Sequence, residues 1–331
     1  MQIPNYFSYT QLAAFSNCPY QYRFAHILRV PMTGKPVFSF GKTMHSVLQK
    51  TFELVNEKKG LGQGDLFSLT PQPPLPAGRG GGDSSSAPRR AAASAKQYMG
   101  SIENSPPSCL GGAGGGINIS LEEILKLYEQ SWIDDWYESD KQKQEYKKKG
   151  REILKEFYAK HQDNWPHAAY LEKGFNIKLR GTRKHENTKT QKHENTKTQK
   201  HENIGTTAVG GEVYTVRGVI DRIDEEDGKL KIVDYKTGSP KDKLTFNEKE
   251  QLLIYQMAVS EIFRQEISSL AFYYLNNNSE VEFLGTDEEL DKTKDKILNI
   301  IKDIKKGEFP AKPSQLCKFC DFYSICEFRK S

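Results

Sequence analysis

The sequence has no long run of apolar residues: no window of its 331 residues approaches the ~20 apolar residues that a bilayer-spanning helix needs. A membrane span is therefore excluded. The first residues, Met1 to Asn5, also lack the basic region and apolar stretch of a signal peptide. Cysteine is scarce, and five is an odd number for a disulfide framework. We therefore expect a reducing, cytoplasmic setting in which disulfides are disfavoured.

The chain also lacks a strong charge of one sign and a complete nucleotide-binding loop. It has 48 Lys+Arg against 43 Asp+Glu. Overall charge is thus a poor indicator of nucleic-acid binding, and any such affinity must come from a local groove. The segment 41–43 resembles the end of a phosphate-binding loop, but Pro36 occupies the place of its first glycine. We therefore do not expect the chain itself to be a helicase.

Glycine and proline are distributed unevenly. Residues 60–116 contain 13 of the 26 glycines and 7 of the 15 prolines. An exact repeat, Lys-His-Glu-Asn-Thr-Lys-Thr-Gln, begins at Lys184 and again at Lys192. Neither composition can bury enough apolar area to offset its ordering entropy, so we predict disordered inserts at 60–116 and 183–203. The 253 residues that remain outside the two inserts fit one domain.

The rest of the chain combines helical and strand periodicity. Capping boxes at Ser8 and Ser120 and the apolar spacing predict helices over 8–15, 20–27, 40–55, from 120 onward, 141–160, 248–263 and 287–306. A period of two predicts strands over 170–180, 212–225, 229–236, 269–275 and 280–284. Helices flanking a mixed central sheet make an α/β (α+β) domain.

The dipeptide Asp227-Gly228 lies between two alternating runs and predicts a tight hairpin. In that register residue 226 faces 229, and Asp221 lies opposite Asp234. Strand alternation then groups the following residues on one face: Val219, Asp221, Ile223, Leu230, Ile232, Asp234 and Lys236.

Two opposed carboxylates on an apolar face are destabilising unless a cation lies between them. Mg²⁺ or Mn²⁺ with oxygen ligands fits this position. Lys236 would point into the same site, where its ammonium could orient a water and stabilise charge on a phosphate. The alternative is a surface hairpin whose acids face water.

Longer motifs around this hairpin resemble a known family. Segments 218–224 and 232–238 resemble the core of the PD-(D/E)XK nuclease superfamily, in its RecB-like or AddB-like exonuclease branch. Segments 9–12 and 18–24 are similar to the branch's N-terminal helix pair, 41–45 to its histidine helix, and 251–255 to its Gln-x-x-x-Tyr motif. The resemblance implies a restriction-endonuclease-like fold and metal-dependent hydrolysis of DNA.

The resemblance also assigns roles to residues. It implies these metal ligands, aided by the Tyr235 carbonyl: His45, Asp221 and Asp234. It implies Lys236 as the catalytic lysine, acting with the two aspartates, and Gln251 and Tyr255 as DNA-positioning residues. Glu172 is a further acidic candidate. We expect an exonuclease of DNA repair or recombination that acts on ends or single strands, with a possible helicase partner. The alternatives are a CRISPR spacer-acquisition nuclease or a catalytically silent DNA-end-binding subunit.

A second group of residues has metal-ligand spacing: Cys317, Cys320 and Cys326, with Cys18 far upstream. Four thiolates suit zinc or a [4Fe-4S] cluster. The resemblance favours the cluster, because AddB-type nucleases and CRISPR-associated iron-sulfur exonucleases pair one N-terminal cysteine with a C-terminal trio. Cys109, in the first insert, is expected to be a spectator.

The chain is thus expected to divide at its inserts. The inserts 60–116 and 183–203 separate the predicted parts of the chain. These parts are an N-terminal helical part of the nuclease domain (1–59), a helical part with the first strand (117–182), the nuclease core (204–310) and an iron-sulfur cysteine segment (311–331).

Overall fold

The structure is a computed structural model that describes residues 3–32, 34–60, 119–181, 212–263 and 265–330. The predicted inserts, apart from Gly60, lie outside these residues, so their disorder stays a prediction. No helix in the described ranges is both long and apolar enough to cross a membrane.

The helices form where the apolar spacing predicts them. Their bounds are α1 Tyr9–Asn17, α2 Pro19–Tyr22, α3 Pro36–Lys58, α4 Leu121–Ser131, α5 Asp140–His161, α6 Phe246–Ile262 and α7 Asp287–Lys306. The capping boxes at Ser8 and Ser120 are confirmed. A π-helical turn, Arg23–Ile27, follows α2, and a 3₁₀ turn, Gln315–Phe319, lies near the C-terminus.

Two helix predictions differ from the structure. The helix predicted over 40–55 begins four residues earlier, because Pro36 occupies the first helical position, where its fixed φ suits the helix and its missing N–H costs nothing. The helix predicted over 20–27 is instead a four-residue α2 followed by the π-helical turn. Both segments keep their predicted place in the chain.

The strands form one mixed six-stranded sheet. Their bounds are β1 Tyr6–Phe7, β2 Ala168–Arg180, β3 Val213–Glu226, β4 Lys229–Lys236, β5 Ile267–Tyr274 and β6 Ser279–Phe283. The pairs β1–β3 and β4–β5 are parallel, and the others are antiparallel. The mixed sheet with flanking helices confirms the predicted fold class. The two-residue β1 was not predicted, since it is too short to show a period.

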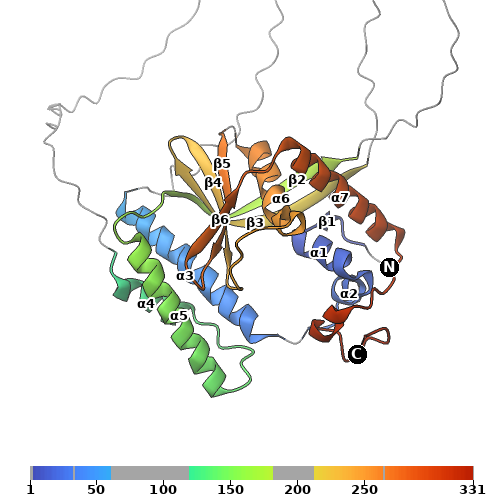
Figure 1. The fold of residues 1–331 in the computed structure, drawn as a ribbon, viewed down its shortest axis with the longest axis horizontal. Coiled ribbons are helices and arrows are strands. Elements are labelled where there is room, and N and C mark those ends of the chain that lie inside the picture. Colours follow the sequence, from blue (N-terminus) through green and yellow to red (C-terminus); the bar gives the residue numbers. More distant parts are fainter. Residues whose placement is uncertain (1–2, 33, 61–118, 182–211, 264, 331) are drawn as a thin grey trace, which may run out of the picture.

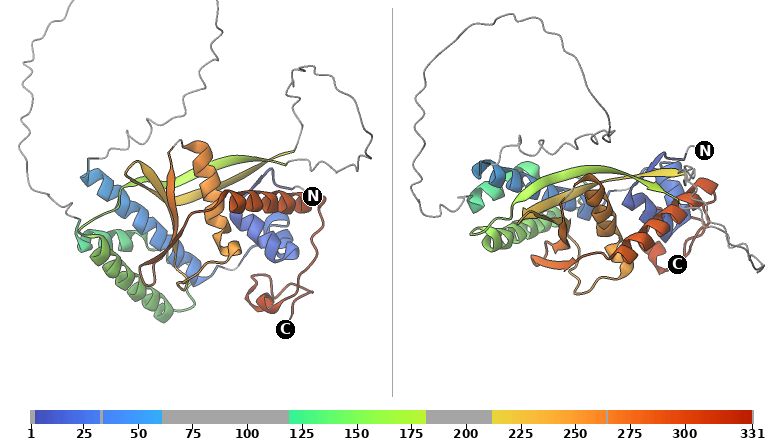
Figure 2. Two further views of the ribbon diagram at one scale, coloured as in Figure 1. Left: turned by 45° about the horizontal axis from the view of Figure 1, so that its top comes forward. Right: turned by 90° about the horizontal axis from the view of Figure 1, so that it is seen from above.

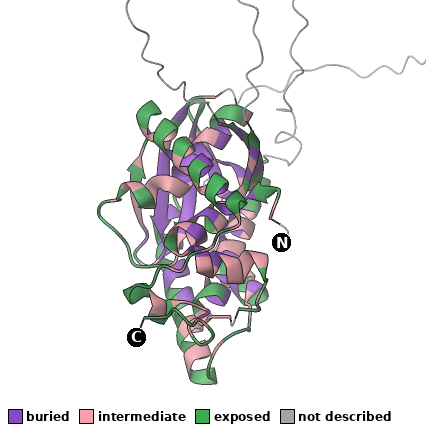
Figure 3. Cartoon of the chain, turned by 90° about the vertical axis from the view of Figure 1, so that its right-hand side faces the viewer, coloured by how far each residue is buried: buried purple, intermediate pink, exposed green. Residues whose placement is uncertain are grey.

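Helices cover both faces of the sheet (Figure 1). One core packs α1, α6 and α7 against it, and a second packs α3, α4 and α5 against it. Figure 2 shows the long β2 running across the molecule beside β3. In Figure 3 the buried strands lie between helices whose outer faces are exposed. Helices such as α3 and α7 therefore bury one stripe of apolar side chains, whereas α6 is buried at every position from Leu252 to Gln256.

β3 changes partners along one edge, and this creates an opening in the sheet. β2 pairs with β3 over almost its full length. The opposite edge of β3 pairs with β1 at 215–216 and with β4 at 222–226. Residues 217–221 lie between these pairings and have no ladder partner on that edge within the described ranges. Asp221 is the last residue of this opening.

A buried ion pair fixes the β3–β4 hairpin beside the opening. Arg222 is only 1% exposed, and its Nε lies 2.9 Å from Asp224 Oδ1. Its Nη1 donates to the Tyr235 hydroxyl at 2.6 Å, and its guanidinium lies 4.4 Å from the centre of the Phe52 ring. One charged side chain thus joins β3, β4 and α3.

We predict that Asp224→Ala lowers the free energy of unfolding by about 3–5 kcal/mol, because it leaves a buried guanidinium without its carboxylate. Denaturant unfolding with linear extrapolation measures the loss. The matched control is Lys229→Ala, which removes an exposed pair with Glu266 on the same hairpin and should cost under about 1 kcal/mol. Equal losses in the two variants would show that the buried pair does not hold the hairpin.

Candidate functional site

The tight turn predicted at Asp227-Gly228 is present. Both residues have positive φ, 51° and 75°, which Asp tolerates and Gly adopts freely. Glu226 pairs with Lys229, and the predicted register continues to the pair Arg222 and Val233. The register is therefore confirmed over these five pairs.

The ladder ends one residue before Asp221 and Asp234, which are not ladder partners. Instead, the backbone N–H of Tyr235 donates to Asp221 Oδ2 at 2.8 Å. A side-chain carboxylate thus continues the pairing where the two backbones stop, and this bond fixes the carboxylate at the opening.

The predicted face assignment holds from Arg222 onward, where Ile223 shares one core with Leu230 and Ile232, but it is wrong at Val219 and Ile220. Ile220 and Ile223 belong to the same core although they are three residues apart, which regular alternation does not allow. The physical reason is an irregularity beside them: Glu172 on β2 has φ 46°, and the β2–β3 ladder passes the position of Glu172 and Asp221 without pairing them. The alternation resets there, so Val219 is exposed while Ile223 is buried.

Three potential metal ligands meet at this irregularity. One atom each of His45, Glu172 and Asp221 lie within 4.8 Å of one another. His45 Nδ1 is 3.4 Å from Asp221 Oδ1. The three side chains come from α3, β2 and β3, so the tertiary fold assembles them. The structure brings His45 and Asp221 together and adds Glu172; Asp234 is not a member of this three-residue group.

Asp234 lies in an adjoining network of β4 and α6. Lys236 Nζ is 2.6 Å from Asp234 Oδ2 and donates to Gln251 Oε1 at 2.8 Å. Gln251 Nε2 in turn donates to Asp234 Oδ1 at 2.7 Å and to the Tyr255 hydroxyl at 2.9 Å. Gln251 therefore fixes the positions of the lysine and the carboxylate relative to each other.

The electrostatics of the site favour a bound cation. Burial, followed by the charge of Asp221, raises the pKa of Asp234 to about 6 against the opposing effect of Lys236. Burial and the charge of Asp221 also raise the pKa of Glu172. Burial lowers the pKa of His45, but its bond to Asp221 and the surrounding acids outweigh this and raise it. Oxygen-rich sites of this kind suit hard divalent ions.

The sequence analysis missed two features of the site. The Tyr235 N–H bond to Asp221 depends on where the ladder ends, which no local pattern reports. The approach of α3 to β4 was also missed: a Cβ at Gly41 would lie 3.7 Å from Thr237 Oγ1. A side chain at this position would make only an ordinary contact, so Gly41 itself gives no signal of the approach.

The four predicted cysteine ligands also converge. Their side chains line a single cavity of about 270 Å³ formed by α2, the π-helical turn that follows it and the C-terminal segment: Cys18, Cys317, Cys320 and Cys326. Backbone N–H groups of Lys312 and Ser314 donate to the sulfurs of Cys18 and Cys317 at 3.4 and 3.3 Å. Cys109 lies outside the described residues.

Curated relatives match parts of the chain. It is 24% identical over 124 residues to the CRISPR-associated exonuclease Cas4 of Francisella tularensis subsp. novicida, covering 37% of this chain and 61% of that protein. It is 39% identical over 71 residues to one subunit of the ATP-dependent helicase/nuclease of Moorella thermoacetica, covering 21% of this chain and 5% of that protein. A solved structure, that of SSO0001, covers 37% of this chain and 55% of its own at 24% identity; its TM-score of 0.27 is too low to support an argument.

A family model matches far more of the chain than either relative does. The model of the PD-(D/E)XK nuclease superfamily matches residues 6–98 and 120–327. This range includes the β3–β4 hairpin, the histidine of α3, the Gln251 network and all four cysteines of the cavity. The chain therefore belongs to the PD-(D/E)XK nuclease superfamily.

Proposed function

We propose that the chain is a divalent-metal-dependent deoxyribonuclease that degrades DNA from ends or single strands in repair or recombination. The observation that supports this most directly is the convergence of His45, Glu172 and Asp221 beside the Asp234–Lys236 pair. Members of this superfamily use divalent metals. Carboxylate oxygens are suitable donors for Mg²⁺ or Mn²⁺, and the histidine nitrogen is the ligand that the family resemblance adds to them.

In this proposal His45, Asp221 and Asp234 hold the ion, with Glu172 as a further ligand and the Tyr235 carbonyl as an aid. The ion would polarise the scissile phosphate and lower the pKa of its water. The raised pKa of Asp234 supports this role, because a nearby cation would favour its ionised form.

Lys236 is the proposed catalytic lysine. Asp234 and Gln251 hold its ammonium within 2.6 and 2.8 Å, which keeps it beside the proposed ion, where it could orient a water or stabilise charge on the phosphate. Gln251 and Tyr255 are one turn apart on α6 and are proposed to position this lysine and the DNA backbone.

The names of the two relatives support the finer parts of the proposal. One is an exonuclease, and the other belongs to a helicase/nuclease. We infer exonuclease action and a possible helicase partner from them. Spacer acquisition and silent end binding are alternatives that a cleavage assay separates.

The first test is cleavage of end-labelled single- and double-stranded DNA with Mg²⁺ or Mn²⁺. Chelation should abolish cleavage, and Asp221→Asn, Asp234→Asn or Lys236→Ala should each slow it by roughly 10²-fold or more, because each removes charge that stabilises the transition state. Matched controls on the same hairpin are Asp227→Asn and Lys229→Ala, which should cleave at the wild-type rate.

Product lengths from the two labelled ends report polarity in the same experiment. Cleavage that survives all three site substitutions would mean that the site is wrong. Tight binding of DNA ends without cleavage in any divalent metal would favour the silent end-binding subunit, and selective processing of spacer-length fragments would favour the acquisition nuclease.

We also propose that Cys18, Cys317, Cys320 and Cys326 hold a [4Fe-4S] cluster. The cavity is larger than a single ion needs, and N–H donors to two sulfurs are typical of thiolate-bound clusters. Among the described residues no three of these sulfurs lie within 4.8 Å of one another, whereas a tetrahedral zinc would hold them about 3.8 Å apart. Thiolate ligands also favour the reducing, cytoplasmic setting expected from the sequence.

The proposed cluster would tie the two ends of the chain together. Anaerobically purified protein should be brown, absorb near ~400 nm and contain iron and sulfide. Cys320→Ser should lose the iron and unfold at a lower temperature, because metal binding contributes to folding. Cys109→Ser is the matched control and should retain both. Stoichiometric zinc without iron would refute the cluster.

A further inference from the structure

The loop between α4 and α5 holds an exposed tryptophan in a strained conformation. Trp136 is 44% exposed, and its φ of 70° lies in the left-handed region, which bulky residues rarely adopt. Such a backbone persists only where neighbouring contacts hold it, and it often marks a functional position. Both the strain and the exposure of a large aromatic ring call for an explanation.

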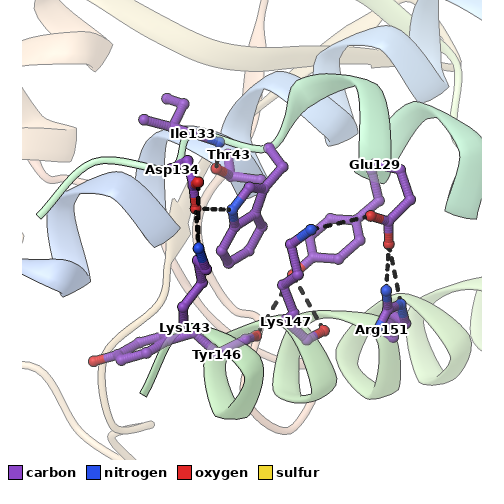
Figure 4. A network of polar contacts seen from close by, with 10 residues as sticks. Thr43, Glu129, Ile133, Asp134, Lys143, Tyr146, Lys147 and Arg151 are labelled. Carbon is purple, nitrogen blue, oxygen red and sulfur yellow. Dashed lines mark hydrogen bonds and ion pairs between the residues drawn. The ribbon is translucent and has the colours of Figure 1, made fainter. Parts of the chain in front are cut away.

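Two hydroxyl groups of α3 hold this loop in place. Thr43 Oγ1 accepts a hydrogen bond from the backbone N–H of Ile133 at 3.1 Å (Figure 4). One turn earlier, Ser39 Oγ donates to the carbonyl of Asp135 at 2.7 Å. Both Ser39 and Thr43 are fully buried. The backbone on the N-terminal side of Trp136 is therefore fixed to the helix at two points.

A further contact braces the loop from the other side. Asp134 accepts a hydrogen bond from the indole N–H of Trp132 at 3.2 Å and forms an ion pair with Lys143 of α5 at 3.3 Å (Figure 4). Both α3 and α5 thus constrain the segment that ends in Trp136.

The Trp136 ring lies against glycine backbone and beneath a lysine. A Cβ added at Gly34 would collide with the ring, so only glycine leaves room for it there. Lys42 Nζ lies 5.2 Å from the ring centre. Lys42 is exposed and has no carboxylate partner among the residues that the structure describes. Its charge is therefore available to an external anion.

This surface continues into the candidate metal site along one face of α3. Phe38, Lys42 and His45 follow at spacings of four and three, which places them on the same side of the helix. Phe38 is 47% exposed. From Phe38 to His45 is two turns, or about 10 Å, which is the length of about three nucleotides of a stacked strand.

We propose that Phe38, Lys42 and Trp136, here called the Trp136 platform, bind the single-stranded DNA that enters the metal site. The inference rests on the proposed function. An exposed aromatic ring stacks on an unpaired base. Lys42 lies over the Trp136 ring, so it would turn toward a phosphate of the same DNA strand and leave that ring face to the base. Duplex DNA offers no such base face except at its ends. The unpaired charge beside the ring favours a nucleic acid over an apolar protein partner, which would leave that charge buried and unpaired.

The test measures binding without cleavage. Fluorescence anisotropy of a short fluorescein-labelled oligothymidylate in EDTA reports affinity for single strands. Trp136→Ala should weaken binding by roughly 5- to 150-fold, the value of one stacked base. Trp136→Phe should retain most of the affinity. Gly34→Ala should weaken binding in the same direction as Trp136→Ala while leaving the tryptophan in the chain, because it displaces the ring.

The matched control is Tyr6→Ala. Tyr6 is an exposed aromatic that lies beneath Arg217, but it belongs to β1 and not to α3. It should bind like the wild type. Lys42→Ala should lower the dependence of log affinity on log salt by about one phosphate contact.

Two results overturn the platform. One is wild-type affinity in both Trp136→Ala and Gly34→Ala while the wild type cleaves DNA, which leaves the nuclease proposal standing. The other is equal weakening by Tyr6→Ala, which shows a distributed surface. A wild-type protein that neither binds nor cleaves DNA would instead refute the proposed function itself. If Trp136→Ala does not fold by circular dichroism, the Gly34→Ala and Trp136→Phe pair decides the question.

Discussion

The site depends on a backbone constraint: one edge of β3 has to pair with two different strands. A strand satisfies its N–H and C=O groups by continuous pairing, and a change of partner leaves some of them free. Here the change falls at 217–221, and the Asp221 carboxylate takes the Tyr235 N–H that the ladder leaves unpaired. The opening therefore admits side chains of three other elements, α3, β2 and α6, to one place in the sheet.

The acids of the β3–β4 hairpin differ in how their charge is balanced. The acid with a full cationic partner serves the fold, and the acids without one form the candidate site. Asp224 has a guanidinium 2.9 Å away in a fully buried pair, which serves the fold. Three residues earlier on β3, Asp221 shares its surroundings with Glu172 and Asp234, and these three acids have only His45 and Lys236 as nearby bases among the described residues. Burial is the main reason that the pKa values of Glu172 and Asp234 are raised, and the charge of Asp221 raises them further. A divalent cation would balance the negative charge of these three acids, as Arg222 balances that of Asp224.

Short sequence patterns correctly predicted the features that depend only on neighbouring residues, namely the hairpin turn and the helix starts. The Asp-Gly turn fixed the register of five residue pairs, and the capping boxes located the starts of α1 and α4. Alternation along β3 was predicted wrongly only at Val219 and Ile220, because the irregularity arises on β2, where Glu172 adopts a positive φ. That residue is far away in the sequence and carries no glycine signal. The contact of His45 with Asp221 likewise spans separate elements, so only the family resemblance suggested it.

Helix α3 links the chemistry to the surface around it. Its buried face packs into the core through residues such as Met44 and Phe52, and its open face carries Phe38, Lys42 and His45. The distance from His45, at the metal site, to Phe38 and Lys42, which are proposed to bind the DNA strand, is then set by the helix. A helix is stiffer than a loop. The loop that carries Trp136 also has a fixed position relative to α3, because Ser39 and Thr43 hydrogen-bond to its backbone. A strand held by the platform would therefore approach the acidic cluster at a fixed distance, and each nucleotide would reach the metal site in the same position.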